Sequence, residues 1–258
     1  MKKSTALITG ASSGIGLELS KIFAHNHYNL VLIARSTHKL DALASELRQA
    51  HQVDVLVLPA DLSQPGAASE IFQTVQSKNL QIDILVNNAG FGVHEPLVKA
   101  ELNETTQMLQ VNVTALTELT RLFLPDMLAR KAGRILNVGS TGSFAPAPYM
   151  AAYAASKAYV LSFTEGLAEE LRGTGVTATA LCPGVTPTGF QDRAQVGDMP
   201  LTRYGVLSAE KVAADGYKAL MRGKRVVVPG LANNLLVLST RLIPHGILLP
   251  FTRQMMTK

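Results

Sequence analysis

The stretch TGASSGIG at residues 9–16 decides the fold of this 258-residue chain. It follows a short β-prone run, residues 5–9, and a helical spacing of apolar side chains begins at Gly14. We therefore expect a strand, a glycine-rich turn and a helix, in that order. The free backbone N–H groups and the positive end of that helix would face whatever lies above the turn, which makes the turn a phosphate cradle.

The three glycines of this turn have separate expected roles. Gly10 permits the tight turn, Gly14 lets a pyrophosphate approach the backbone, and Gly16 allows close packing of helix on strand. The spacing G-x-x-x-G-x-G departs from G-x-G-x-x-G, and a merely tight turn is the alternative interpretation. The residues expected to contact a dinucleotide here are Gly10, Ser12, Ser13, Gly14, Ile15 and Gly16.

The alternation of strand and helix continues beyond the turn. Further strands are predicted at 30–33, 53–58, 82–86, 134–138, 176–181 and 226–228, and helices at 38–49, 67–78, 104–129 and 150–172. Strands that alternate with helices of this length indicate right-handed βαβ units. We predict an α/β, doubly wound Rossmann fold with a parallel sheet of about seven strands and helices on both faces. No composition break divides the chain, so residues 1–258 are expected to form one domain.

Composition excludes several classes of protein. The chain is 47% apolar, which argues against disorder, and it has no 18-residue apolar run that would span a bilayer. The single Cys182 cannot form an internal disulfide and is expected to be a small buried hydrophobe in a reducing compartment. Met1-Lys2-Lys3 is not followed by an export signal, so a cytoplasmic location is expected. The six His residues are scattered, and no metal site is predicted.

The net charge of +5 is unevenly distributed. Residues 1–215 carry a net −2, whereas residues 216–258 hold seven Lys and Arg and no acid. Aromatic residues make up only 5%, which disfavours nucleic acid as a partner. Within this tail, 231–258 forms a basic, apolar C-terminal extension. One hypothesis is peripheral contact with an anionic membrane; the alternatives are a helix packed on the core, a subunit contact or a cover over a pocket.

The end of the second predicted strand bears on the choice of dinucleotide. Arg35 lies 19 residues after Gly16, close to the place where an NAD-specific fold has an acid for the ribose 2′-hydroxyl. Arg35 and Ser36 would instead suit a 2′-phosphate. A charge-assisted bond of about 1.5–3 kcal/mol would favour NADP(H) over NAD(H) by roughly 10- to 150-fold. An ordinary solvated Arg is the alternative.

Three residues form a candidate proton-transfer set. Tyr153 and Lys157 lie four apart in a predicted helix and so share one face. An ammonium beside a phenol would lower the pKa of the phenol. Ser140 follows the strand at 134–138, at the carboxyl edge where open α/β sheets bind ligands.

From about Thr5 to Thr188 the chain resembles the short-chain dehydrogenase/reductase family. The matching pieces are Thr9-Gly10-x-x-x-Gly14-x-Gly16, Asp61-Leu62, Asn87-Asn88-Ala89-Gly90, Asn112, Ser140, Tyr153-x-x-x-Lys157 and Pro183-Gly184 followed by Thr188. Ser140 lies 13 residues before Tyr153, as the family pattern expects. One departure is Gly139, where many members have a second Ser.

The resemblance implies roles for these residues. Tyr153 would exchange a proton with the substrate oxygen, which Ser140 would hydrogen-bond, while Lys157 would hold the nicotinamide ribose and Asn112 a water. The resemblance further places Asp61 and Leu62 beside the adenine, and Asn87 to Gly90 at the adenosine ribose, where Asn87, Ala89 and Gly90 are the candidate site residues and the segment also braces the sheet. It places Pro183, Gly184 and Thr188 at the nicotinamide end. It also implies a homodimer or homotetramer.

The favoured function is NADPH-dependent reduction of a lipophilic ketone or aldehyde. The alternatives are an alcohol dehydrogenase that works in the oxidative direction and a non-catalytic dinucleotide sensor. Residues 187–222 are expected to form a substrate lid region, and the pocket is expected to be apolar. The residues expected to line that pocket are Phe144, Ala145, Pro146, Ala147, Met150, Leu201, Val206 and Leu207.

Overall fold

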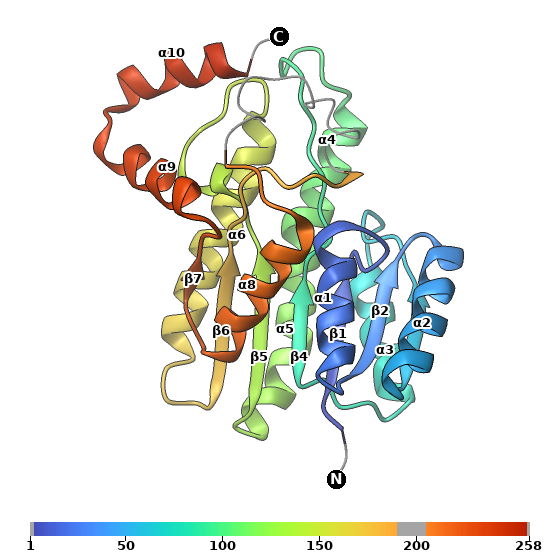
Figure 1. Ribbon diagram of the computed structural model, residues 1–258. Coiled ribbons are helices and arrows are strands. Elements are labelled where there is room, and N and C mark those ends of the chain that lie inside the picture. The colour runs from blue at the N-terminus through green and yellow to red at the C-terminus, as the bar shows by residue number, and fades with distance from the viewer. Residues whose placement is uncertain (1–2, 190–204, 257–258) are drawn as a thin grey trace.

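The computed structural model describes residues 3–189 and 205–256 and contains one parallel sheet (Figure 1). Its seven strands lie in the order β3-β2-β1-β4-β5-β6-β7, and every described pairing is parallel. The strands are β1 (Thr5–Thr9), β2 (Asn29–Ala34), β3 (Val55–Pro59), β4 (Ile84–Asn87), β5 (Gly133–Val138), β6 (Val176–Leu181) and β7 (Val226–Val227). The predicted sheet is confirmed.

Helices cover both faces of the sheet. One face packs against α1 (Gly14–His25), α2 (Thr37–His51) and α8 (Ala209–Met221). The other packs against α3 (Ala67–Ser77), α5 (Leu116–Ala129) and α6 (Ala151–Glu170). Side chains of β1 alternate between these two cores, because Ala6 and Ile8 belong to the first and Leu7 to the second. The doubly wound Rossmann fold is therefore confirmed.

The strand order creates a crevice at one edge of the sheet. β1 pairs with β2 on one side and with β4 on the other, so the chain leaves β1 in one direction and later crosses back past it. In open α/β sheets, ligands bind at such a switch point, outside the carboxyl ends of the strands. The glycine turn after β1 and the chain after β4 lie at this edge.

One predicted helix is wrong in detail. The single helix expected at 104–129 is divided into α4 (Leu102–Leu109), a π-helical turn (Gln110–Ala115) and α5. The widened turn contains Asn112, which is buried. Single π turns inside α-helices are frequent at functional sites.

Part of the expected lid region, 187–222, is a core helix and not a lid. Residues 209–221 form α8, whose Val212 and Leu220 are buried in the core against the sheet. This part is a structural helix, since removing it would expose the core. Residues 190–204, with Leu201, lie outside the described part of the chain.

The C-terminal extension forms two helices, α9 (Leu231–Leu242) and α10 (His245–Met255), separated at Pro244. Pro250 lies inside α10. Along the described ranges, no helix is both long enough and apolar enough to cross a bilayer.

Candidate active site

A cleft of about 590 Å³ lies at the carboxyl edge of the sheet. It is formed by the segments that follow β1, β2, β3, β4, β5 and β6, together with the start of α6. Of the residues predicted for the site, those that line it are Gly10, Ser12, Ser13, Gly14, Ile15, Arg35, Ser36, Asp61, Leu62, Ala89, Gly90, Ser140, Tyr153, Lys157, Pro183, Gly184 and Thr188. Gly16, Asn87 and Asn112 are predicted site residues that lie behind its wall.

The glycine turn fits a phosphate group. Gly14 has a φ of +55°, and a Cβ there would lie 2.7 Å from Thr188 Cγ2. Gly16 packs so closely on the Gly10 carbonyl that a side chain has no room. The Ser13 side chain makes no capping hydrogen bond to α1, and the first turn of α1 has no acid. An anion above this turn would therefore meet free N–H groups and the positive helix end.

The Asn pair after β4 corrects one predicted contact. The Asn87 side chain is buried, where its amide donates to Thr120 Oγ1 at 3.0 Å and to Asn137 Oδ1 at 2.9 Å. It braces β4 against β5, but it does not line the cleft. Asn88 does, and its Nδ2 donates to the Thr9 carbonyl at 2.9 Å. Successive side chains of a strand point to opposite sides, so of the predicted segment 87–90 it is Asn87 alone that does not line the cleft.

Cationic side chains gather at the far end of the cleft. Arg35 is exposed at the end of β2, and Lys39, which was not predicted, lies in the first turn of α2 and lines the same end. Ser36 is the N-cap residue of α2, and its Oγ lies 3.2 Å from His38 Nδ1. Partial burial raises the pKa of Asp61, but hydrogen bonds from Ser63 and the charge of Arg35 outweigh it and leave the pKa below its ordinary value.

Ser140, Tyr153 and Lys157 meet on the floor of the cleft. Ser140 follows β5 and caps a short 3₁₀ turn (Thr141–Phe144), where its Oγ accepts from the Gly142 N–H at 3.0 Å. A hydrogen bond from Ser140 also lowers the pKa of Tyr153. Lys157 Nζ donates to the Val138 carbonyl at 2.8 Å and lies 5.9 Å from the centre of the Tyr153 ring.

The pKa of Tyr153 is raised, whereas the sequence predicted that Lys157 would lower it. Burial raises the pKa of Tyr153 to about 12, even though Ser140 lowers it in part. Burial lowers the pKa of Lys157 to about 8. The ammonium was expected to lower the pKa of the phenol, but Nζ points at the Val138 carbonyl and lies beside the ring. Removal of both groups from water dominates instead.

Asn112 joins the loop after β4 to helix α6. Its Oδ1 accepts from the Phe91 N–H at 3.1 Å, and its Nδ2 donates to the Phe91 carbonyl at 3.0 Å and to Ser156 Oγ at 3.1 Å. A Cβ on Gly90 would lie 3.0 Å from Asn112 Oδ1 and 3.2 Å from Lys157 Nζ. Asn112 therefore fixes the backbone beside Lys157, one layer behind the cleft.

The apolar end of the cleft has only part of the predicted lining. Ala147 and Met150 line it as predicted, together with Met256 from the end of the tail, which was not predicted. Phe144 packs instead near the buried Cys182, which is the small hydrophobe that the sequence suggested, and Leu207 packs against the core. The Cys182 sulfur also explains the glycine before Ser140, because a Cβ on Gly139 would lie 3.1 Å from it.

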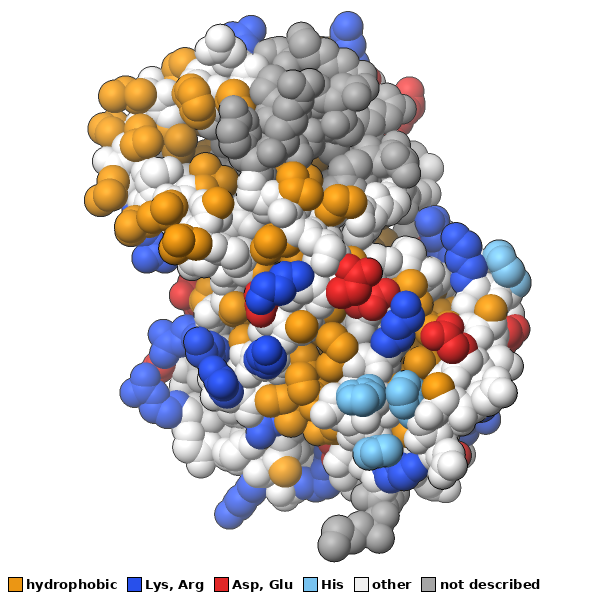
Figure 2. All heavy atoms as spheres, viewed as in Figure 1, with side chains coloured by type: hydrophobic (Ala, Val, Ile, Leu, Met, Phe, Trp, Pro, Cys, Tyr) orange, Lys and Arg blue, Asp and Glu red, His pale blue; other side chains and the backbone are white. Residues whose placement is uncertain are grey.

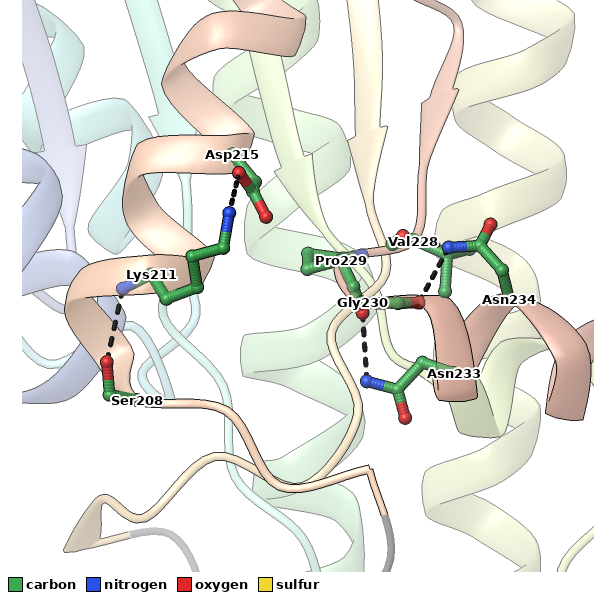
Figure 3. A network of polar contacts seen from close by, with 8 residues as sticks. All are labelled: Ser208, Lys211, Asp215, Val228, Pro229, Gly230, Asn233 and Asn234. Atoms are coloured by element: carbon green, nitrogen blue, oxygen red, sulfur yellow. Dashed lines mark hydrogen bonds and ion pairs between the residues drawn. The ribbon is translucent and has the colours of Figure 1, made fainter.

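Asn233 of α9 is a positioning residue that the sequence did not indicate (Figure 3). It is buried, and its Nδ2 donates to the Gly205 carbonyl at 3.0 Å and to the Pro229 carbonyl at 2.9 Å. A Cβ on Gly184 would lie 2.6 Å from Asn233 Cγ. One side chain thus joins the chain at Gly205 to the chain after β7, and it packs closely against Gly184 in the loop after β6, which lines the cleft.

We expect Asn233→Ala to lower the free energy of unfolding by about 1–3 kcal/mol, because it leaves buried carbonyl groups unpaired. Asn234→Ala is the matched control, since the exposed Asn234 also donates to two carbonyls, those of Val228 and Gly230. Its loss should stay below about 1 kcal/mol because water replaces those bonds. Urea titration of both variants measures the difference, and equal losses would contradict the positioning role.

Known proteins resemble this chain in sequence and in structure. The family model described as short chain dehydrogenase matches residues 4–219. A short chain dehydrogenase of Pseudocercospora fijiensis is 41% identical over 182 residues, which cover 70% of this chain and 59% of that protein. A very-long-chain 3-oxoacyl-CoA reductase of Anas platyrhynchos is 34% identical over 184 residues, 69% of this chain and 58% of that protein. The chain therefore matches less than two thirds of the length of either relative.

A solved structure is similar over almost the whole chain. It is a short-chain dehydrogenase from Sphingobium yanoikuyae in complex with NADPH. The two share 33% of their sequence and superpose with a TM-score of 0.83, covering 95% of each chain.

Proposed function

The chain belongs to the short-chain dehydrogenase family, and we propose that it is an NADPH-dependent reductase of lipophilic ketones or aldehydes. The family and the fold support oxidoreductase chemistry between an alcohol and a carbonyl group. The cofactor, the direction and the class of substrate are the proposal.

The observation that carries the proposal is that a turn suited to a phosphate group and a candidate proton-transfer cluster line one cleft. The glycine turn and the cluster of Ser140, Tyr153 and Lys157 line the same cavity. A dinucleotide held on the turn would supply the hydride, which is the cofactor's own chemistry. The protein would supply the proton and hold the substrate oxygen.

The residues divide this work as follows. Ser140 and Tyr153 both line the cleft, so two hydroxyl groups could converge on one carbonyl oxygen. A Tyr153 pKa of about 12 keeps the phenol protonated at neutral pH, which suits a proton donor. As the carbonyl becomes an alkoxide, the Tyr153 proton moves to it, and the nearby Lys157 ammonium stabilises the phenolate that remains.

The preference for NADPH is inferred from charge. Arg35 and Lys39 would hold a 2′-phosphate, and Ser36 would add a hydroxyl donor. The similar enzyme from Sphingobium yanoikuyae was solved with NADPH. Asp61, an acid that lines the cleft, already accepts hydrogen bonds from Ser63. It is not in the position at the end of β2 where a ribose-binding acid is expected.

The substrate class is inferred from the pocket. Ala147, Met150 and Met256 present apolar side chains beside the catalytic cluster. The similar protein from Anas platyrhynchos is named for very-long-chain 3-oxoacyl-CoA, whose acyl chain is lipophilic. The apolar lining and the name of this relative both support an apolar carbonyl compound as the substrate, and not a sugar phosphate.

The proposal is tested by following NADPH and NADH oxidation, side by side, over ketones and aldehydes of graded length and polarity. We expect turnover with NADPH that rises with apolar length. Binding of NADPH without turnover of any carbonyl, at every pH tested, would overturn the reductase and favour the sensor.

Arg35→Ala tests the cofactor preference. We expect kcat/KM for NADPH to fall about 10- to 150-fold and that for NADH to stay within about threefold, since the lost contact is made only by the 2′-phosphate. Arg48→Ala is the control, because that Arg belongs to the neighbouring helix α2 but donates to the Val55 carbonyl, away from the cleft. An equal fall with both cofactors would contradict a 2′-phosphate role for Arg35.

A further inference from the structure

The last two helices, α9 and α10, expose large apolar side chains to solvent. Four leucines, Leu231, Leu235, Leu238 and Leu242, form one stripe along α9 and are 77%, 59%, 52% and 74% exposed. On α10, Ile247 and Phe251 lie one turn apart and are 65% and 59% exposed. Figure 2 shows these apolar side chains gathered at the upper left, over the two helices. We name these six residues the apolar face.

The side of α9 that faces the protein carries the polar Asn233. The helix buries Asn233 and Val237 and leaves the leucine stripe outside, although a surface helix usually points its apolar stripe at the core. Contiguous apolar surface of this kind marks an interaction site. Within the described residues, no part of the chain covers the apolar face, so we infer that a partner covers it.

The charge of the region selects the partner. Residues 231–258 hold three Lys and Arg and no acid, and two of these bases, Arg241 and Arg253, lie near the ends of the two helices. The four other bases of the tail precede β7. Apolar side chains flanked by bases are complementary to a bilayer with anionic headgroups. A second copy of this chain would bring the same excess of positive charge against itself, which disfavours a symmetric contact.

The apolar face is attached to the mouth of the cleft. Met256, directly after α10, is buried against Met150 and lines the cleft, and its carbonyl lies 3.1 Å from His94 Nε2. Arg253 Nε donates to the Tyr149 hydroxyl at 3.3 Å. The helix that carries Ile247 and Phe251 outside thus ends inside the pocket.

We propose that the apolar face docks on the surface of an anionic lipid bilayer and brings the mouth of the cleft to that surface. Carbonyl compounds dissolved in the lipid would then reach the pocket beside Met256 without crossing water. The docking itself rests on the exposed helices; the delivery of substrate rests on the function proposed above.

Flotation of the full chain with vesicles tests the docking without cofactor or substrate. We expect the protein to float with vesicles of phosphatidylcholine and phosphatidylserine, and to float less with pure phosphatidylcholine or at high salt. A variant with Leu235→Gln, Leu242→Gln, Ile247→Gln and Phe251→Gln should bind the anionic vesicles at least about tenfold more weakly. Its replaced side chains are exposed, so the fold should be kept.

The matched control is Leu97→Gln with Leu102→Gln. These leucines are 69% and 76% exposed but lie among acids, with Glu95, Glu101 and Glu104 close in the sequence. The control should float like the parent protein. Equal flotation of the four-site variant, or no flotation of the parent protein, overturns the proposal. A third outcome also overturns it: the parent protein fails to float but sediments as a dimer, and the four-site variant sediments as a monomer. The apolar face would then join two copies of the chain.

Activity separates this proposal from the previous one. With NADPH, the four-site variant should reduce a short water-soluble ketone at the parent rate but a long-chain ketone held in anionic vesicles about tenfold more slowly. Equal rates on the vesicle-bound ketone would refute the delivery. A parent protein that floats but reduces neither ketone would leave the docking established and refute the reductase.

Discussion

Tyr153→Phe is expected to lower kcat for carbonyl reduction by about 10²- to 10⁴-fold and to leave the Kd for NADPH within about twofold. The change removes only the hydroxyl that would give its proton to the substrate oxygen. The ring stays, and with it the packing against Met150. Single-turnover NADPH oxidation measures the chemical step, and fluorescence titration measures cofactor binding.

Tyr159→Phe is the control for this experiment. Tyr159 lies on the same helix, α6, is 38% exposed, and its hydroxyl is 2.9 Å from Thr117 Oγ1. Loss of this exposed bond should leave kcat unchanged within about twofold. Unchanged turnover in Tyr153→Phe would refute the proton-donor role, and so would an equal loss in both variants.

The sheet could be predicted from the sequence because its strands are buried on both faces. Runs such as residues 6–8 and 30–33 are apolar throughout, and each is closed by a turn or a helix start. The π-helical turn could not be predicted in this way. Six residues change the helical period too little to be read from apolar spacing, and the turn contains Asn112, whose three hydrogen bonds reach Phe91 and Ser156.

The candidate site was predictable where it depends on strand ends and helix starts. Ser140, Arg35 and the glycine turn all follow a strand directly, and parallel strands bring such positions to one edge. Lys39 also had a signal, because it lies four residues after Arg35 at a helix start. Asn233 and Met256 had none, since their contacts join the end of the chain to the cleft through tertiary packing.

Lys157→Met is expected to stabilise the protein while it disables the enzyme. Lys157 is 5% exposed, and burial lowers the pKa of its ammonium from 10.5 to about 8. The unfolded chain therefore binds the proton more tightly than the folded protein does, and charging this buried group costs folding free energy at every pH below about 8. The shift corresponds to about 3 kcal/mol at pH 7, as an upper bound.

Methionine has a similar length and carries no charge. It loses the hydrogen bond to the Val138 carbonyl, worth about 1 kcal/mol. We therefore expect a net gain of about 1–2 kcal/mol in the free energy of unfolding at pH 7, and a Tm higher by about 2–8 °C. As the pH rises from about 8 to 10.5, the buried ammonium of the parent protein no longer destabilises the folded state. The difference in free energy of unfolding between the parent and the Met variant should therefore shrink over that range.

Activity should move the opposite way, with kcat/KM for reduction falling about 10²-fold or more, because no ammonium remains to stabilise the phenolate of Tyr153. In the parent protein the same charge is lost as the pH rises through about 8, so its kcat/KM should fall there as well, and the Met variant should lack that step. Lys218→Met, an exposed site on α8, should change neither stability by more than about 0.5 kcal/mol nor the pH profile. A Met variant less stable than the parent at pH 7 would mean that Lys157 is held chiefly for packing. A variant that is more stable and inactive would mean that the fold accepts a destabilising buried charge where the chemistry needs it.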